Sequence, residues 1–286
     1  MSKVYLNGEI LPLSEARLPA LDAGLLLGAG LFETLRAYDG TVFRLADHLD
    51  RLDASAKALD IPIQESSEEL ARAIAAVLEA NDLRDARCRL TVTRGPLPAE
   101  GEGMPPVRPT CLITAGAMTP YADELYAKGM TVIVSDVRVN DKDPTCGHKT
   151  TNYLTNLLVL REAHGRGAQE ALRFNGPGRL AEGCISNVFV GNGGRLRTPP
   201  VGEGCLPGIA RKVVLELARA EGIEASEEPI AAQEVLNVEE MFLTNTIMEV
   251  MPVCRIERHP IGEDQPGPVT QRLAAAYKKC VESAKP

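Results

Sequence analysis

Apolar residues recur at helical spacing in several stretches of the chain. Over residues 47–59 they fall three or four positions apart, at Leu49, Leu52, Ala56 and Leu59, which predicts an amphipathic helix. The same spacing predicts helices over residues 68–78, 152–164, 208–220 and 269–281. In the helix over 152–164, the leucines at positions 154, 157, 158 and 160 are expected to face the protein interior.

Other stretches alternate between apolar and polar residues or form short apolar runs, which predicts strands. They cover residues 4–6, 88–93, 110–115, 131–139, 171–174, 184–190 and 241–243. Asn7-Gly8 and Asp39-Gly40 are typical of tight hairpin turns. Because predicted strands and helices are interspersed along the whole chain, we expect a mixed fold of class α/β (α+β).

Two segments without periodic pattern suggest how the chain is divided. Residues 95–109 are rich in Pro, Gly and Glu, which predicts a long loop of the kind that serves as a lid or binding element. Residues 116–125 contain Met118-Thr119-Pro120 and are interpreted as a linker. We therefore expect a first domain over residues 1–115 and a second over residues 126–286.

The composition is that of an ordinary globular enzyme, and it argues against nucleic acid and membranes as binding partners. The chain has 286 residues, 44% of them hydrophobic, and a formal net charge of −8, so no general attraction to nucleic acid or anionic membranes is expected. No run of about 18 apolar residues predicts a membrane span, and the first residues lack the pattern of a signal peptide. The seven cysteines form no CxxC pair and the four histidines are scattered, so we expect buried thiols, a cytoplasmic location and no metal site.

Lys149 stands in a short polar segment, residues 147–153, immediately before a predicted apolar helix. Taken alone, a lysine is most often a solvated surface charge. Burial at the start of a helix would lower the pKa of its amine, which could then act as nucleophile and proton carrier. Such a lysine can form a Schiff base with an aldehyde cofactor, as pyridoxal phosphate chemistry requires.

Glu182 follows 33 residues later, in the segment Glu182-Gly183-Cys184-Ile185-Ser186-Asn187. Its neighbours are mostly small or apolar, and a carboxylate in such surroundings is costly without a positive partner. A protonated pyridine nitrogen would be one such partner, and it would strengthen the ring as an electron sink. An arginine is the alternative partner.

Three further segments offer donors for a phosphate group. Gly208 leads into a predicted helix whose first N–H groups, at Ile209 and Ala210, can bind an anion. Thr246 follows a predicted buried strand and can add a hydroxyl donor. Arg51, on the helix over 47–59, can reach a phosphate with two N–H groups. Each segment alone also has an ordinary explanation as a capped helix, a turn or a surface charge.

Together and in this order, the segments resemble those of the class IV aminotransferases, the fold-type IV pyridoxal phosphate enzymes. The resemblance extends from Val4 to Thr270. It covers branched-chain aminotransferases, D-amino acid aminotransferases and 4-amino-4-deoxychorismate lyases. It implies a small α/β domain, a larger pseudo-barrel domain, pyridoxal 5'-phosphate between them, and a homodimer that acts on amino acids and 2-oxo acids.

The resemblance also implies a role for individual residues. Lys149 would be the Schiff-base lysine and catalytic residue, Glu182 the partner of the pyridine nitrogen, and Tyr153 a neighbour of the cofactor's phenolic oxygen. The implied phosphate ligands are Arg51, the backbone amides of Ile209 and Ala210, and Thr246, while Gly208, Ser186 and Asn187 complete the cofactor-binding set. The implied substrate-binding residues are Phe32, Arg36, Leu27 and Ile247.

Several positions depart from the family's pattern, so the resemblance does not identify the substrate. Ala210 stands where many members have threonine, which removes a hydroxyl but leaves the backbone donor. Leu27 stands where branched-chain enzymes carry a tyrosine that shapes the substrate pocket. The loop over 94–100 lacks the arginine and histidine pair with which D-amino acid enzymes bind the substrate carboxylate.

Two reactions share this set of residues. In transamination Lys149 would remove the substrate's α-proton and redeliver it at the cofactor; in the lyase reaction pyruvate leaves and p-aminobenzoate forms. Tyr153 and Arg36 fit the transaminase, whereas Thr34 and the segment 244–253 are similar to the lyases. We favour an aminotransferase of the branched-chain or D-amino acid type, with 4-amino-4-deoxychorismate lyase as the alternative. The intact Lys149 argues against an idle member that serves only as a scaffold.

Overall fold

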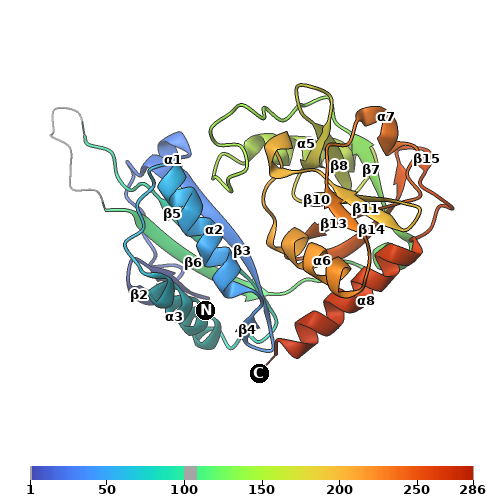
Figure 1. The fold of residues 1–286 in the computed structure, drawn as a ribbon. Coiled ribbons are helices and arrows are strands. Elements are labelled where there is room, and N and C mark those ends of the chain that lie inside the picture. Colours follow the sequence, from blue (N-terminus) through green and yellow to red (C-terminus); the bar gives the residue numbers. More distant parts are fainter. Residues whose placement is uncertain (1, 100–107, 286) are drawn as a thin grey trace. The chain divides into compact units, whose positions relative to one another are not determined.

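The computed structural model describes residues 2–99 and 108–285, which form two compact units (Figure 1). Unit 1 holds the chain up to Thr119, the segment His148–Asn152, and the C-terminal residues from Ala284. Unit 2 holds Pro120–Gly147 and Tyr153–Ser283. The chain therefore leaves unit 1 inside the segment 116–125 and returns to it for the five residues around Lys149.

Unit 1 is built on a six-stranded antiparallel sheet in the order β2-β1-β6-β5-β3-β4. Its strands are β1 (Lys3–Leu6), β2 (Glu9–Pro12), β3 (Gly30–Tyr38), β4 (Thr41–Val42), β5 (Ala86–Thr93) and β6 (Thr110–Ala117). Asn7-Gly8 and Asp39-Gly40 form the two predicted hairpin turns, with positive φ at all four residues. The predicted loop over 95–109 follows β5, and its residues 100–107 lie outside the described part of the chain.

The helices of unit 1 are α1 (Ala23–Leu27), α2 (Leu45–Ala58) and α3 (Ser67–Ala80). The apolar faces predicted for α2 and α3 are buried, and they join apolar sheet residues such as Leu35 and Leu90 in one core. A capping box between Ser66 and Glu69 fixes the start of α3. Packing on this core is what holds α2 in place over β3, which matters for the charged residues that both elements carry.

Unit 2 contains a nine-stranded mixed sheet, whose main path runs β12-β11-β10-β13-β14-β7-β8-β9 while β15 pairs with β14. The strands are β7 (Met130–Val134), β8 (Glu170–Phe174), β9 (Leu180–Gly183), β10 (Asn187–Asn192), β11 (Arg195–Thr198), β12 (Ala225–Glu227), β13 (Glu240–Asn245), β14 (Glu249–Ile256) and β15 (His259–Pro260). Although β9 ends this path, a three-residue turn joins it to β10, so the sheet curls back on itself toward a barrel. The strand predicted over 184–190 was therefore wrong at its start, because Cys184 to Ser186 form this turn.

The helices of unit 2 lie around this sheet (Figure 1). They are α4 (Asp123–Lys128), α5 (Leu154–Gly165), the 3₁₀ helix η1 (Val201–Glu203), α6 (Ile209–Ala220), α7 (Ala232–Val235) and α8 (Pro268–Ser283). Among the described residues, none of the helices combines the length and the apolar character that crossing a membrane requires.

The orientation expected for α5 was wrong for three of its four leucines. Leu154, Leu157 and Leu158 are exposed to 67%, 53% and 44%, and only Leu160 packs against a buried cluster. The buried side of the helix is formed instead by Val159 and Ala163, two smaller residues that fit closely against the sheet. Apolar spacing identified the helix but not its inner face, because α5 carries leucines on more than one side.

Candidate functional site

Lys149 is held in unit 1 by backbone pairing with the edge of β3. Leu31 and Thr150 form an antiparallel bridge, flanked by hydrogen bonds from Phe32 N–H to Lys149 O and from Thr151 N–H to Gly30 O, both 2.9 Å long. The Thr151 hydroxyl also donates to Gly28 O at 2.8 Å. The segment His148–Asn152 is thus attached to β3 by a single β-bridge and its flanking hydrogen bonds, which fix the backbone from which the Lys149 side chain extends.

The Lys149 amine lies on the ring of Phe32. Its Nζ is 4.3 Å from the ring centroid, and the guanidinium carbon of Arg89 is 3.7 Å from the same centroid. Phe32 is buried, whereas Lys149 and Arg89 are half-buried. Two cationic side chains therefore share one aromatic ring, an arrangement that draws a carboxylate to the neighbourhood of the lysine.

Arg51 lies on α2 and is bound bidentately by Glu33 of β3. Its Nε donates to Glu33 Oε1 at 2.8 Å and its Nη2 donates to Glu33 Oε2 at 2.6 Å. His48, one helical turn earlier, places Nδ1 2.8 Å from Glu33 Oε2. Burial opposes ionisation of Glu33, but the positive charge of Arg51 and the hydrogen bonds from His48 and Arg51 outweigh it and lower the pKa of Glu33 to about 2.

The same face of α2 also contacts the segment that carries Lys149. Ser55, one turn after Arg51, places its hydroxyl oxygen 2.9 Å from Nδ1 of His148. Ser55 is buried and His148 is half-buried. Arg51 and Lys149, two of the predicted cofactor residues, are therefore fixed to one scaffold within unit 1.

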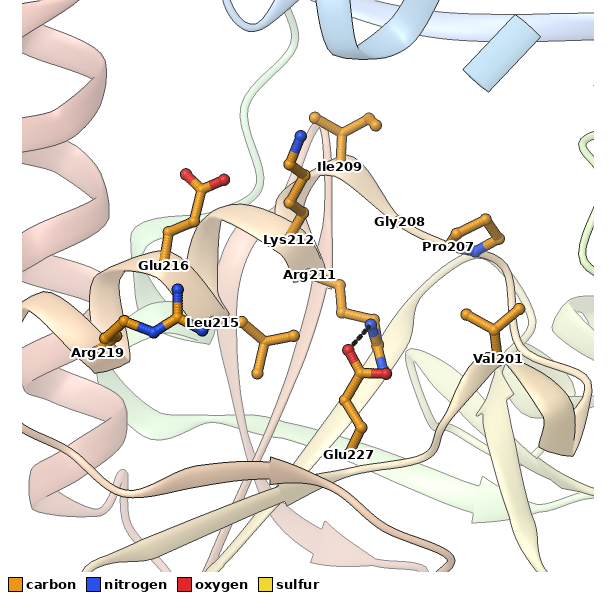
Figure 2. Close-up of a pocket in the computed structure, with 10 residues that line it drawn as sticks. All are labelled: Val201, Pro207, Gly208, Ile209, Arg211, Lys212, Leu215, Glu216, Arg219 and Glu227. Carbon is orange, nitrogen blue, oxygen red and sulfur yellow. Dashed lines mark hydrogen bonds and ion pairs between the residues drawn. The ribbon is translucent and has the colours of Figure 1, made fainter. Parts of the chain in front are cut away.

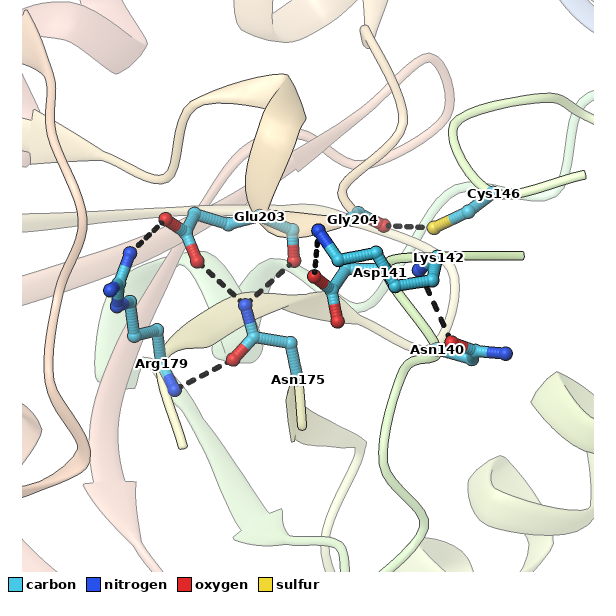
Figure 3. A network of polar contacts seen from close by, with 8 residues as sticks. All are labelled: Asn140, Asp141, Lys142, Cys146, Asn175, Arg179, Glu203 and Gly204. Carbon is cyan, nitrogen blue, oxygen red and sulfur yellow. Dashed lines mark hydrogen bonds and ion pairs between the residues drawn. The ribbon is translucent and has the colours of Figure 1, made fainter. Parts of the chain in front are cut away.

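The loop that leads to Lys149 belongs to unit 2 and is tied down by a polar network (Figure 3). Asn175 donates through Nδ2 to Glu203 Oε2 at 2.6 Å, and Arg179 donates to Glu203 Oε1 at 2.7 Å. The Cys146 thiol donates to Gly204 O at 3.3 Å. The Cys146 bond connects the loop before Lys149 to the segment that leads into α6, and the Asn175 and Arg179 bonds tie that segment to the β8–β9 connection.

Glu182, in β9, is bound to that same segment. Its Oε2 accepts a hydrogen bond from the backbone N–H of Leu206 at 2.8 Å. Arg173 of β8 stands opposite Glu182 in the strand ladder, so the arginine that we considered as an alternative partner lies on the neighbouring strand. Arg173 donates to Asn156 Oδ1 at 3.5 Å.

Burial and the negative charge of Glu182 raise the pKa values of two cysteine thiols. Burial raises the pKa of Cys205 to about 12, and the negative charge of Glu182 adds to that effect. The pKa of Cys146 is also raised, again by burial first and by Glu182 second. Cys146 precedes Lys149 by three residues, so Glu182 lies close to the loop that leads to the lysine.

The turn 184–186 is organised around the buried carboxylate of Glu170. The N–H groups of Cys184 and Ile185 donate to it at 2.9 and 3.2 Å, and the Ser186 hydroxyl donates at 3.0 Å. A Cβ at Gly183 would lie 2.3 Å from Ser186 Oγ, so a larger residue there would displace the Ser186 side chain from its place in this turn. This explains why the residues after Glu182 turn instead of continuing as a strand.

The start of α6 has no side-chain cap, and Asn187 packs closely against it. Gly208 is the N-cap residue and supplies no side-chain cap, and a Cβ at this position would lie 1.9 Å from Asn187 Oδ1. Asn187 in turn donates to Leu206 O at 2.8 Å. The first N–H groups of α6, including those of Ile209 and Ala210, have no partner within the helix, which makes this terminus suited to an anion.

A cavity of about 460 Å³ flanks the same terminus (Figure 2). Val201, Pro207 and Leu215 line it together with charged residues of α6. Arg211 donates to Glu227 Oε1 at 3.1 Å and to Pro199 O at 2.8 Å, so it anchors the first turn of α6 to a side chain of β12 and to the backbone at Pro199.

Thr246 and Ile247 lie in the turn after β13, and Asn245 shapes that turn. Asn245 Oδ1 accepts from the N–H groups of Ile247 and Met248, both at 2.8 Å. Its Nδ2 donates to Ile185 O at 3.1 Å. Thr246 is therefore linked to the turn 184–186 through its immediate neighbour.

The remaining predicted residues are distributed over both units. Tyr153 is the N-cap residue of α5 and donates its hydroxyl to Cys184 O at 3.4 Å. Leu27 ends α1 and is 65% exposed. The Arg36 guanidinium lies 4.4 Å from the ring centroid of Tyr38, on the same face of β3 as Phe32.

The predicted residues thus form two sets, each held together within its own unit. Unit 1 holds Lys149, Arg51, Phe32, Arg36 and Leu27, while unit 2 holds Glu182, Tyr153, Ser186, Asn187, Thr246, Ile247 and the start of α6. The sequence did not single out Glu33, Arg89, Glu170 or Asn245. A carboxylate in a buried strand is the signal that would have identified Glu33 and Glu170, because burial demands a partner.

Comparison with known proteins gives consistent matches. A family model described as "Amino-transferase class IV" matches residues 30–256. The putative branched-chain-amino-acid aminotransferase of Methanocaldococcus jannaschii is 39% identical over 279 residues, covering 96% of this chain and 95% of that protein. The D-alanine aminotransferase of Staphylococcus haemolyticus is 31% identical over 284 residues and 99% of each chain.

One further relative and one solved structure bear on the reaction and on the fold. The aminodeoxychorismate lyase of Bacillus subtilis is 31% identical over 282 residues, covering 98% of this chain and 95% of that protein. The crystal structure of the branched-chain amino acid aminotransferase of Escherichia coli superposes with a TM-score of 0.92 at 30% identity. That match covers 100% of this chain and 96% of the other.

Proposed function

Because the chain belongs to the class IV aminotransferases, we propose that it moves an amino group between an α-amino acid and a 2-oxo acid with pyridoxal 5'-phosphate as cofactor. The observation that carries this proposal is the anchoring of Lys149 on β3, with its amine on the ring of Phe32, which Arg89 also contacts. A reactive lysine must be presented in a fixed direction, and the β-bridge to β3 supplies that fixed backbone.

The donor set of the chain fits this cofactor. Its aldehyde requires an amine, its phosphate requires cationic and N–H donors, and its ring nitrogen requires a carboxylate. Lys149 supplies the amine, Arg51 and the uncapped start of α6 the phosphate donors, and Glu182 the carboxylate. The absence of a side chain at Gly208 keeps the helix start accessible, since a Cβ there would collide with Asn187.

We assign the proton transfer to Lys149. When bound, the protonated pyridine ring withdraws the electron pair left on the substrate's α-carbon. The Nζ of Lys149 takes the proton from that carbon, and Glu182 keeps the ring nitrogen protonated through its negative charge. Arg89 contacts the same Phe32 ring as Lys149, and its guanidinium is suited to hold the substrate carboxylate.

We further propose that the active form is a homodimer. Leu154, Leu157 and Leu158 form an exposed apolar stripe on α5, and Leu25 to Leu27 form a second exposed group on α1. Apolar groups of this kind are typical of surfaces covered by another subunit. A second copy of the chain is the partner that the family resemblance favours.

The second candidate function is 4-amino-4-deoxychorismate lyase. The similarity to a lyase over nearly the whole chain favours it, as do Thr34 and the segment 244–253. Both reactions would use Lys149 as the proton carrier, so the residues of the site support either one. Their difference lies in the co-substrate, since transamination requires a 2-oxo acid and the lyase reaction does not.

A paired assay separates the two candidates. The purified chain is incubated with 4-amino-4-deoxychorismate alone, and separately with a panel of amino donors plus 2-oxoglutarate. We expect amino transfer in the second mixture and no pyruvate in the first; pyruvate formed without an acceptor would favour the lyase. Borohydride reduction of the cofactor-loaded chain should attach the cofactor to Lys149, and a label on another lysine would contradict the assignment.

A further inference from the structure

Glu33 is a buried carboxylate with three charged or polar hydrogen-bond donors and no substrate role assigned to it. It lies on β3 and is only 1% exposed. Arg51 occupies both of its oxygens, and His48 occupies Oε2 as well. A buried carboxylate of this kind stabilises the fold only weakly compared with an apolar residue of the same size, so its presence points to a different task.

The ionisation of Glu33 decides the direction of these hydrogen bonds. An ionised carboxylate accepts and cannot donate, so Nδ1 of His48 must carry a proton and donate it to Oε2. His48 is itself 1% exposed, which leaves its ring little room to rotate. The three side chains therefore form one fixed hydrogen-bonded cluster, in which His48 holds the carboxylate and the carboxylate holds the guanidinium.

The bidentate contact fixes the plane of the Arg51 guanidinium. Nε and Nη2 both point at Glu33, and as a consequence Nη1 is directed away from the carboxylate. The long arginine side chain has lost its rotational freedom before any ligand arrives, so binding costs less entropy. Arg51 is thus presented as a rigid, oriented donor.

We propose that Glu33 and His48 are positioning residues that orient Arg51 toward the phosphate group of the cofactor. This inference rests on the proposed function, in which Arg51 binds that phosphate. Glu33 also cancels the charge of Arg51, so the contribution of the pair to phosphate binding is directional rather than a general positive field. Changes at Glu33 or His48 should therefore alter phosphate recognition and leave recognition of the pyridine ring intact.

The test compares pyridoxal 5'-phosphate with pyridoxal, which lacks the phosphate. The whole chain is first freed of cofactor. Spectroscopic titration then gives the dissociation constants of pyridoxal and of pyridoxal 5'-phosphate for the wild type and each variant. The preference for the phosphate is the first constant divided by the second. Glu33→Asp keeps the charge but withdraws the carboxylate by one methylene. We expect it to lower this ratio about tenfold or more, the scale of one charge-assisted hydrogen bond, with pyridoxal affinity nearly unchanged.

Glu33→Gln separates orientation from charge. Its amide places N–H donors against those of Arg51 and His48, so the orientation is lost and the ratio should again fall. If Glu33 only tuned the local charge, Glu33→Gln would raise the ratio and Glu33→Asp would leave it unchanged, and that result would overturn the proposal. His48→Leu and His48→Gln provide a second pair, in which Gln retains a donor and should retain most of the ratio.

Glu240→Gln is the matched control for loss of a buried carboxylate. Glu240 accepts hydrogen bonds from the N–H and hydroxyl of Thr270 at 2.8 and 2.7 Å, and Thr270 is not one of the predicted cofactor residues. It should leave the ratio unchanged even if it lowers the melting temperature. A wild-type chain that binds neither pyridoxal compound would overturn the proposed function together with this inference. A wild type that prefers the phosphate while both Glu33 variants keep that preference would overturn only the inference.

Discussion

The carboxylate of Glu182 and the backbone N–H of Leu206 are joined by a 2.8 Å hydrogen bond. Leu206 lies two residues before the N-cap of α6, so the proposed partner of the ring nitrogen is connected to the helix start that we propose for the phosphate. Within unit 2 these two parts of the site are one structural piece. A substitution at Glu182 can therefore act through its charge or through α6, and the choice of replacement separates the two.

Glu182→Gln should remove the charge and keep the link to Leu206, because a glutamine oxygen still accepts the N–H. We expect turnover to fall by roughly 10² or more, since proton abstraction loses its support, with a smaller change in cofactor affinity. Glu182→Ala removes both features and should weaken cofactor binding as well. Steady-state kinetics and cofactor titration of both variants check this, and equal affinity losses in the two would contradict it.

Cys146 offers a separate readout of the Glu182 charge. The negative carboxylate disfavours the thiolate, so Glu182→Gln should lower the pKa of Cys146. The pH dependence of iodoacetamide labelling, followed by peptide mass spectrometry, measures that pKa. Cys280 on α8 is the internal control. An unshifted Cys146, or an equal shift at Cys280, would show that the two groups are not coupled.

Gly208→Ala should disturb the start of α6 without straining its backbone. Its φ of −67° and ψ of 138° suit alanine, but the new Cβ would lie 1.9 Å from Asn187 Oδ1. Asn187 must then move and lose its bond to Leu206 O, at a cost of about 1–3 kcal/mol of stability. Urea unfolding and cofactor titration measure the two effects. Gly202→Ala, where nothing lies within 4 Å of the added Cβ, should change neither.

Acid should destabilise the chain partly through Glu33. Its pKa is lowered from 4.5 to about 2 in the folded chain, so its contribution is present above pH 4.5 and disappears as the pH falls toward 2. Relative to the protonated carboxyl, the ionised one favours the folded chain by roughly 3 kcal/mol. Urea unfolding between pH 6 and pH 2.5 should show a steeper loss of stability for the wild type than for Glu33→Gln. Parallel curves would mean that Glu33 does not carry this pH dependence.

The exposed leucines of α5 should matter for assembly and little for folding. Leu154→Glu combined with Leu158→Glu places two charges on the apolar stripe, which should convert a dimer to a monomer in sedimentation velocity experiments. The melting temperature of the monomer unit should change little, because both positions are exposed. Leu236→Glu, at an exposed leucine outside the stripe, is the control. A dimer that survives the double substitution would place the subunit contact elsewhere.

Much of the fold could be predicted because apolar spacing reports local periodicity directly. The helix α2 and the Asn7-Gly8 and Asp39-Gly40 hairpins follow from the spacing of leucines and from turn residues that accept positive φ. The inner face of α5 could not be predicted, since its leucines lie on more than one side. The turn 184–186 was missed because its cause, the carboxylate of Glu170, lies on a different strand.

The candidate site divides in the same way. Lys149 and Glu182 could be proposed from the sequence because a lysine in a short polar segment and a carboxylate among small residues are unusual locally, and their roles stay predictions. The contact between Arg51 and Glu33 could not, because it joins a helix to a strand 18 residues earlier in the chain. Pairings of this kind depend on tertiary packing, which the pattern of a single chain does not encode visibly.

The return of His148–Asn152 to unit 1 bears on how the chain folds during synthesis. The edge of β3 at Leu31 receives its partner, Thr150, only after the ribosome has passed well into unit 2. Asn152 follows Thr119 by 33 residues, or roughly 2–7 s of translation at about 5–20 residues per second. During that interval a nascent unit 1 exposes an unpaired strand edge, the kind of surface that chaperones and other nascent chains can bind. Insertion of the lysine-bearing segment is therefore also the step that closes this edge.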